Sequence, residues 1–358
     1  MNQINTSHPG SRQTGLSMIE LLVALAIGSF LIIGAVTVQS NTRKSFDVGE
    51  QQARLQENAR FVLATLEPDL QMAGVYGYTQ DTNAVMWDFD DALTAPKDLR
   101  MTSPAAPGLP ESLKDCGDNF VLDVLVPVTA INGKDDWDLK CDPEGGGQAD
   151  DTDALILRHS APGRVDPDAT KLQVFSERRS AQMNTRLFIS DDAPDSVKDD
   201  LREVRDMVVQ AYYISKDSDG YPGVPALRVK FLTTDGASPV IVDRELIRGV
   251  EDLQVQFGID PGLDVSPKDG KPDDPGDDGM ADLVNGYAQR YVNAGDALLS
   301  SAQVVSVRVW VRVRADHEEP GFTDNRTYEY ADTKFAANDH FRRLVLSRTI
   351  FLRNSRQL

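Results

Sequence analysis

Cysteine and histidine are scarce in this chain of 358 residues, which contains two cysteines and four histidines. The histidines are scattered and lack the spacing that zinc ligands show: His8, His159, His317 and His340. The sequence also lacks a Gly-x-Ser-x-Gly elbow, a phosphate-binding loop and a His-Glu-x-x-His motif. We therefore expect a protein that is not an enzyme, and a membrane-tethered hydrolase is the alternative from another functional class.

Positive charge is also in short supply, because 37 Lys and Arg face 56 Asp and Glu for a net charge of −19. Such a balance repels phosphate backbones, so we expect no nucleic-acid partner. Hydrophobic residues make up 41% of the chain, which is enough for a proper core. The length allows one large domain or two ordinary ones.

The two cysteines, Cys116 and Cys141, are an even pair at moderate separation. In a chain delivered across a membrane this pattern predicts one disulfide, which would stabilise the fold by roughly 3–4 kcal/mol. Two unpaired buried thiols are the alternative.

Long hydrophobic runs are confined to one segment, from Leu16 to Val38. As a helix this segment is long enough to cross a hydrocarbon layer of about 30 Å. A cleaved secretory signal is the alternative, but the apolar part of such signals is usually only about 7–15 residues long. The sequence therefore predicts a membrane helix near the N-terminus.

One ionisable residue, Glu20, lies near the start of this apolar run. A lone carboxylate carried to the middle of a bilayer would cost roughly 2.5–3.5 kcal/mol, so such a residue usually has a partner. A side chain that snorkels to the membrane interface is the alternative.

The helical pattern continues from about residue 41 to residue 73, with one apolar stripe facing a head domain. The stripe consists of Leu55, Ala59, Val62, Leu66, Leu70 and Ala73. Pro68 predicts a kink or an early break in the last turn, and Gly74 predicts the C-terminal cap.

Strand patterns follow, most clearly at Val304–Arg314, where valines alternate with polar residues that include three arginines. We expect the arginines on a solvated sheet face, with a nucleic-acid or partner surface as the alternative. Further expected strands are Val250–Ile259, Asn119–Val126, Asp153–His159, Met207–Ser215, Leu227–Thr233 and Phe341–Leu352. The fold class is therefore α+β, with a long N-terminal helix packed on a mainly antiparallel head.

The stretch from Gly15 to Ala24, GLSMIELLVA, resembles the class III signal of type IV pilins and pseudopilins. The resemblance implies that a prepilin peptidase cuts after Gly15 and methylates Leu16. It also implies that Glu20 pairs with the N-terminal amine of a neighbouring subunit in the filament. Two departures are the single basic residue of the leader, Arg12, and Thr37 where major pilins usually have a proline.

Four further segments resemble PilW-type minor pilins: Gln71–Gly77, Gly249–Asp260, Val304–Arg314 and Phe351–Asn354. The resemblance implies a cleaved leader (1–15), a transmembrane and assembly helix (16–74) and a periplasmic head (75–358). It implies a single-pass inner-membrane protein that moves to the pilus at the cell surface and joins a complex that primes assembly and caps the fibre tip. The implied partners are other minor pilins, the major pilin, the prepilin peptidase and the inner-membrane assembly machinery. A type II secretion pseudopilin and a tip adhesin are the alternatives.

Two acidic stretches stand apart from these motifs. Residues 260–282 form a candidate Ca²⁺ site, because calcium takes six to eight oxygen ligands, although the spacing departs from that of an EF-hand. The candidate ligands are Asp273, Asp274, Asp277, Asp278 and Asp282. A solvated insertion without any cofactor is the alternative. The second stretch, residues 142–153, is predicted to be a mobile loop.

Overall fold

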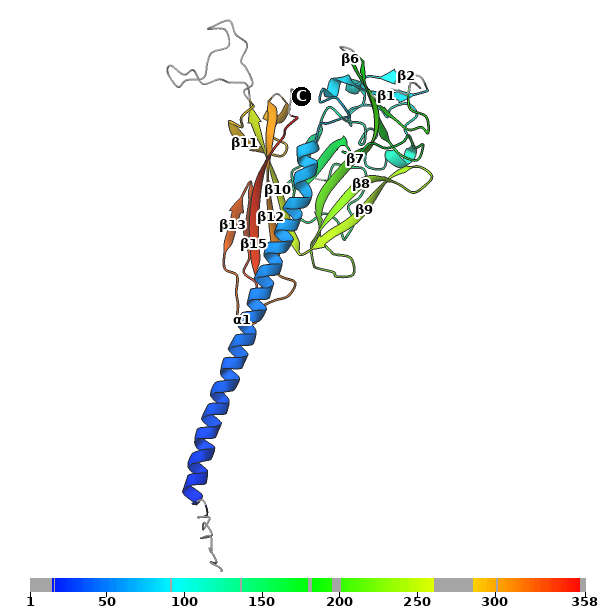
Figure 1. Cartoon of the computed structure of the whole chain (residues 1–358). Coiled ribbons are helices and arrows are strands. Elements are labelled where there is room, and N and C mark those ends of the chain that lie inside the picture. The colour runs from blue at the N-terminus through cyan, green and yellow to red at the C-terminus, as the bar shows by residue number, and fades with distance from the viewer. Residues whose placement is uncertain are drawn as a thin grey trace, which may run out of the picture. The chain divides into compact units, whose positions relative to one another are not determined.

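The computed structural model describes Gly15 and residues 17–354, except for residues 91, 136, 180–181, 195–200, 261–285 and 301. One long helix, α1 (Met18–Met72), is followed by strands in three sheets (Figure 1). The predicted α+β class with mainly antiparallel strands is therefore confirmed. The chain divides into two compact units, Met1–Ala53 and Arg54–Leu358, and α1 contributes to both.

The second unit contains the apolar stripe of α1 that the sequence predicts. Its members are all buried, with at most 5% exposure: Leu55, Ala59, Val62, Leu66, Leu70 and Ala73. They belong to one core with Leu253 and Val255 of strand β10 and with Val309 and Val311 of strand β12. The last turns of α1 are therefore part of the head.

α1 continues past Pro68, so the early break predicted at this proline is wrong. Proline removes one hydrogen bond from the preceding turn. The turn persists because Leu66 and Leu70, which flank Pro68, are fully buried, while Pro68 itself is exposed. The cap predicted at Gly74 is confirmed, since this residue has a φ of +79° and its N–H donates to a carbonyl of β4 at 3.1 Å.

The larger sheet has nine strands, of which seven follow the order β2-β1-β6-β5-β7-β4-β3, and β8 connects β7 to β9. Within the described strands β1 pairs with β6 in parallel, and every other pair is antiparallel. The bounds are β1 (Val85–Phe89), β2 (Ala92–Thr94), β3 (Val128–Ile131), β4 (Ala154–Ser160), β5 (Gln173–Arg179), β6 (Gln182–Phe188), β7 (Arg202–Ser215), β8 (Ala226–Thr234) and β9 (Pro239–Arg248).

The second sheet has four strands in the order β11-β10-β12-β15, and a separate hairpin is formed by β13 and β14. The bounds are β10 (Val250–Asp260), β11 (Arg290–Asn293), β12 (Gln303–Arg314), β13 (Thr327–Tyr330), β14 (Thr333–Ala336) and β15 (Arg343–Phe351). Short 3-10 turns lie at Thr82–Ala84, Pro96–Asp98, Glu111–Leu113 and Ala297–Ser300.

One expected strand, Asn119–Val126, is wrong, because the segment forms a series of turns. Its backbone groups bond within the turns and to the side chain of Arg158 instead of to a neighbouring strand. The Asn119 amide donates to three carbonyls of residues 100–104, and Arg158 donates to the carbonyls of Phe120 at 2.8 Å and Val126 at 2.9 Å. The other six expected strands are present as β12, β10, β4, β7, β8 and β15.

Asp153, the residue before β4, joins the two larger sheets. Its N–H donates to the carbonyl of Leu253 in β10 at 2.8 Å. Its two carboxylate oxygens accept the N–H groups of Val255 at 2.8 Å and Gly133 at 2.9 Å. Burial raises the pKa of Asp153 to about 7, although the two hydrogen bonds act in the opposite direction. One carboxyl group therefore ties β10 to β4 and to the loop after β3.

Replacement of Gly133 by alanine is expected to destabilise this junction. A Cβ at Gly133 would lie 2.4 Å from the backbone nitrogen of Thr152, and backbone cannot move aside as a flexible side chain can. We expect Gly133→Ala to lower the free energy of unfolding by about 1–3 kcal/mol in denaturant titrations of the detergent-solubilised chain. Gly163→Ala is the control, because nothing lies within 4 Å of the added carbon. Equal stability of the two variants would contradict the role of Gly133.

The carboxyl group of Asp153 is expected to make stability depend on pH. Because its folded pKa of about 7 lies above the ordinary value of 3.8, the unfolded chain releases this proton first, and the contribution to stability is lost as pH rises between these values. Relative to Asp153→Asn, which does not titrate, the wild-type free energy of unfolding should fall by up to about 1.4 kcal/mol per pH unit. Denaturant titrations from about pH 5 to about pH 7.5 measure this slope. A difference between the two proteins that stays constant with pH would refute it.

Candidate functional site

The N-terminus of α1 carries a reciprocal pair of hydrogen bonds between Ser17 and Glu20. The Ser17 N–H donates to Glu20 Oε2 at 2.9 Å, and the Glu20 N–H donates to Ser17 Oγ at 3.3 Å. This arrangement is a capping box, which satisfies two backbone donors that the first turn of a helix leaves free. The Ser17 hydroxyl also donates to Oε2 at 3.0 Å. Glu20 Oε1 has no hydrogen-bond partner among the described residues, so it is open to a donor from another molecule.

The large apolar side chains of α1 between residues 18 and 38 are exposed, from 52% at Val23 to 86% at Met18. An apolar surface of this size marks contact with a membrane or another protein. The hydroxyls of Ser29 and Thr37 donate to carbonyls of the preceding turn, each at 2.8 Å, so the helix itself satisfies them. Among the described helices, α1 alone has the length and hydropathy to cross a membrane, a property that N-terminal signal sequences share.

The other predicted site residues of the N-terminus and of the acidic loop are described only in part. Gly15 is exposed and lies just before α1, whereas Leu16 lies outside the described residues. The candidate calcium ligands also lie outside them: Asp273, Asp274, Asp277, Asp278 and Asp282. Within the described ranges no group of three or more His, Cys, Asp or Glu side chains is placed to hold a metal ion.

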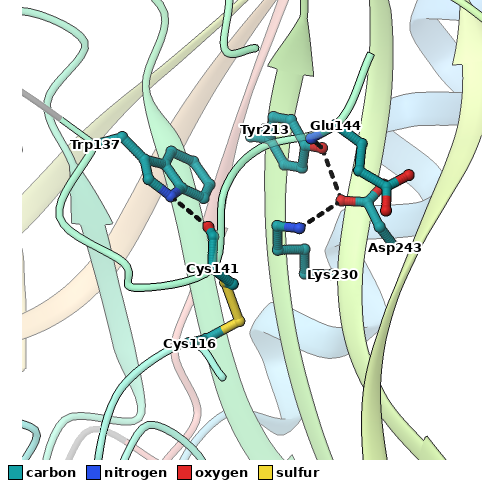
Figure 2. The surroundings of a disulfide bond; sticks show 7 residues. All are labelled: Cys116, Trp137, Cys141, Glu144, Tyr213, Lys230 and Asp243. Carbon is teal, nitrogen blue, oxygen red and sulfur yellow. Dashed lines mark hydrogen bonds and ion pairs between the residues drawn. A yellow bond between two sulfur atoms is a disulfide. The ribbon is translucent and has the colours of Figure 1, made fainter. Parts of the chain in front are cut away.

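Cys116 and Cys141 form the disulfide that the sequence predicts, and Figure 2 shows its surroundings. The indole N–H of Trp137 donates to the carbonyl of Cys141 at 2.7 Å. The Trp137 ring packs edge-on against Tyr213 of β7, with ring centroids 5.2 Å apart. For a sequence separation of 25 residues, the loop closure contributes about 3.5 kcal/mol to stability. The disulfide therefore closes an irregular segment on itself, and Trp137 packs that segment against the nine-stranded sheet.

The acidic stretch 142–153 is hydrogen-bonded to this sheet, so the prediction of a mobile loop is wrong. The Glu144 N–H donates to the Tyr213 hydroxyl at 2.8 Å, and that hydroxyl donates to Asp243 at 2.7 Å (Figure 2). The carbonyl of Gly145 accepts the N–H of Asp217 at 2.7 Å. A Cβ at Gly145 would lie 2.4 Å from the Asp217 carbonyl oxygen, so the glycine permits this close approach of two backbones.

Three arginines on one face of the four-stranded sheet are paired with Glu251 of β10. The distances are 3.2 Å for Arg312, 3.6 Å for Arg314 and 2.6 Å for Arg343. The ring of Phe335, from the hairpin β13–β14, lies with its centroid 4.0 Å from the Arg312 guanidinium carbon. Arg312 is only 6% exposed, so the solvated face expected for this row is wrong at this position. Charges buried in this way require such partners.

Arg308, on the same face of β12, has no carboxylate partner among the described residues. Its guanidinium carbon lies 3.6 Å from the ring centroid of Tyr291 in β11, and its Nε donates to Thr349 Oγ1 in β15 at 3.2 Å. The Tyr291 ring reaches β12 across β10 at Gly258, where an added Cβ would lie 3.0 Å from the ring. The two terminal nitrogens of Arg308 donate to no described group. The Arg308 side chain is thus held in place, and its two terminal NH₂ groups point to no described acceptor.

Sequence reasoning missed several of these residues. Ser17 was open to prediction, because a serine three residues before a glutamate at the start of an apolar run is a known signal of a helix start. Glu251 was not, because it is 61 residues from Arg312 and 92 residues from Arg343 in the sequence. Nothing local marks such a partner.

Comparisons with known proteins agree with the two resemblances. Residues 211–354 match the family model of type IV pilus-assembly protein W, and residues 10–36 match that of the prokaryotic N-terminal methylation motif. No curated protein matches the chain. A type IV-like pilin from Thermus thermophilus aligns at 11% identity over 64% of this chain and 84% of that chain, with a TM-score of 0.25 that is too low to show a shared fold.

Three of the four segments that resemble PilW-type minor pilins lie within the matched residues, whereas Gln71–Gly77 lies outside them. The methylation motif covers Gly15, Leu16 and Glu20, and the pilus-assembly match covers the end of β7 and every strand from β8 to β15. The chain is therefore PilW-like and is similar to the minor pilins of type IV pili.

Proposed function

We propose that this chain is a minor pilin that takes part in priming type IV pilus assembly and lies at the fibre tip, with a structural and not an enzymatic role. The observation that carries the proposal is Glu20, an acid at the start of an exposed apolar helix with one carboxylate oxygen unpaired among the described residues. The matches to the methylation motif and to the pilus-assembly protein support the proposal.

The path of the protein follows from this role. The precursor enters the inner membrane through the helix 16–74, with the head 75–358 in the periplasm. Prepilin peptidase removes the leader 1–15 by cutting after Gly15 and methylates the new N-terminus at Leu16. The inner-membrane assembly machinery then transfers the helix into the pilus, where the head meets other minor pilins and the major pilin.

The charge of Glu20 sets the position along the helix bundle at which the subunit enters the pilus. In an apolar bundle a lone carboxylate is costly, and so is the lone N-terminal amine of a neighbouring subunit, so the two charges attract strongly when both are desolvated. Glu20 Oε2 is occupied by Ser17, whereas Oε1 can accept from the amine without loss of the capping box. A subunit displaced along the bundle would leave both charges unpaired.

Cleavage is expected to require Gly15. Mass spectrometry of the membrane-derived wild-type protein should show an N-terminus at methylated Leu16, and Gly15→Ala should leave a precursor that still carries the leader. Gly28→Ala is the control, because nothing lies within 4 Å of its added carbon and it lies inside the apolar run. Normal trimming of Gly15→Ala, or a wild-type cut beyond Glu20, would overturn the proposal.

The charge of Glu20 is expected to matter more than its role as a cap. Glu20→Gln keeps an acceptor for Ser17 but removes the charge, and Ser17→Ala removes the cap but keeps the charge. We expect Glu20→Gln to lower incorporation into sheared pili at least about tenfold, since an unpaired buried charge costs several kcal/mol. Ser17→Ala should cost only about 1 kcal/mol of helix stability and enter pili normally. Immunoblots of pilus and membrane fractions measure both, and normal incorporation of Glu20→Gln would show the charge to be dispensable.

A further inference from the structure

Among the described strands, β15 is an edge strand whose outer side is open along most of its length. The even-numbered residues direct their backbone N–H and carbonyl groups toward β12. Two hydrogen bonds show this: the Leu352 N–H donates to the Val305 carbonyl, and the Arg342 carbonyl accepts from the Ala315 N–H. In an antiparallel strand the alternate residues therefore turn their N–H and carbonyl groups outward. Those residues are Arg343, Val345, Ser347, Thr349 and Phe351.

The described residues close this outer edge at one end only. The Arg343 carbonyl accepts from the side chain of Arg326 at 3.4 Å. From Val345 to Phe351 the outward backbone groups have no partner among the described residues. Ser347 is exposed, and the Phe351 side chain is 62% exposed. An open edge of this kind is a template for another strand.

Arg308, which has no carboxylate partner in the described part of the chain, lies next to this edge. It is cross-strand to Thr349, on the same sheet face as Ser347 and Phe351, and its Nε already points to the Thr349 hydroxyl. The Tyr291 ring on one side and Trp310 on the other, with centroids 3.6 Å and 5.5 Å from the guanidinium carbon, hold it in place. Arginine and aromatic residues that are fixed in this way are typical of the energetic centre of an interface.

From these two features we propose that β15 is a docking site for an extended segment of another pilus protein, which adds to the sheet as a fifth strand. An acidic side chain of that segment pairs with Arg308. The choice of occupant follows from charge, because Arg312, Arg314 and Arg343 share the carboxylate of Glu251 and Arg308 alone in this row lacks an acid among the described residues. The inference rests on the proposed function only in that the partner belongs to the pilus.

The geometry of the edge also specifies the sequence of the partner. A strand added to β15 lies about 4.8 Å from it, and its residue opposite Thr349 is on the face of Arg308. The next residue on that face, two positions along, lies opposite Ser347 or Phe351. The segment should therefore carry Asp or Glu two residues from an apolar residue that covers Phe351, and its backbone should bond the outward groups of Val345 to Phe351.

The test places a photo-crosslinking amino acid at Ser347 of the full-length chain in piliated cells. We expect a cross-link to one other pilus protein, with the linked peptide showing this acidic and apolar spacing by mass spectrometry. Arg308→Glu should lower the cross-link yield at least about tenfold, and replacement of the partner's acid by arginine should restore it in the Arg308→Glu background.

Arg244→Glu is the matched control, because Arg244 is an exposed arginine on the edge strand β9 that also lies over a ring, at 4.9 Å from the centroid of Phe231. It should leave the yield unchanged, and Arg308→Gln provides a milder change should charge reversal reduce folding. A cross-link that is insensitive to Arg308, or one only within the chain or to a second copy of it, would overturn the docking site. A chain that is trimmed to Leu16 and enters pili without this cross-link refutes the docking site alone, whereas an untrimmed chain refutes the proposed function.

Discussion

The burial of one helical stripe in a core that includes residues of both larger sheets is the contact around which the head is organised. Leu66 and Leu70 of α1 are fully buried in a core that includes Leu253, Val309 and Val311 of the four-stranded sheet. Each fully buried Leu or Val contributes roughly 1.5–3 kcal/mol. A sheet with one apolar face needs such a second layer, and here the layer is the last third of α1. The helix that would anchor the protein is therefore also an essential part of its core.

Buried arginines of the described residues are paired with acids or with backbone carbonyls. The chain is acidic overall, yet its buried arginines each meet acids or carbonyls: Arg343 contacts Glu251, and Arg158 donates to two carbonyls of the segment 119–126. These contacts carry little net stability, because desolvation offsets most of the attraction, but loss of one partner is costly. They fix which loop lies on which sheet. Arg308 departs from this pattern, and for that reason it is informative about function.

The sequence predicted the elements whose pattern is local. The alternation of valines in β12 and the stripe from Leu55 to Ala73 follow directly from one buried face, and the structure has both. The segment Asn119–Val126 has the same apolar content as a strand, but the distant Arg158 pairs with its carbonyls and allows consecutive turns.

Whether a residue of the candidate site could be predicted depended on how far its partners are from it in the sequence. Ser17 could be predicted as the capping partner of Glu20 because both belong to one turn. The contacts that hold Arg308 could not be predicted, because Tyr291 and Thr349 come from strands on opposite sides of β12. The Tyr291 ring also passes over β10 only because Gly258 has no side chain there. Glycines of this kind carry no pattern until their neighbours are known. The same limit applies to Gly145, whose close contact is with Asp217.

The hydroxyls of the apolar helix have one further consequence. Ser29 and Thr37 direct their protons to carbonyls of their own helix, so neither needs a partner from its surroundings. Lipid tails and the side chains of adjacent helices are then nearly equivalent solvents for this surface. Passage from bilayer to fibre would therefore exchange one apolar environment for another. The new polar contact would be at the first turn of the helix.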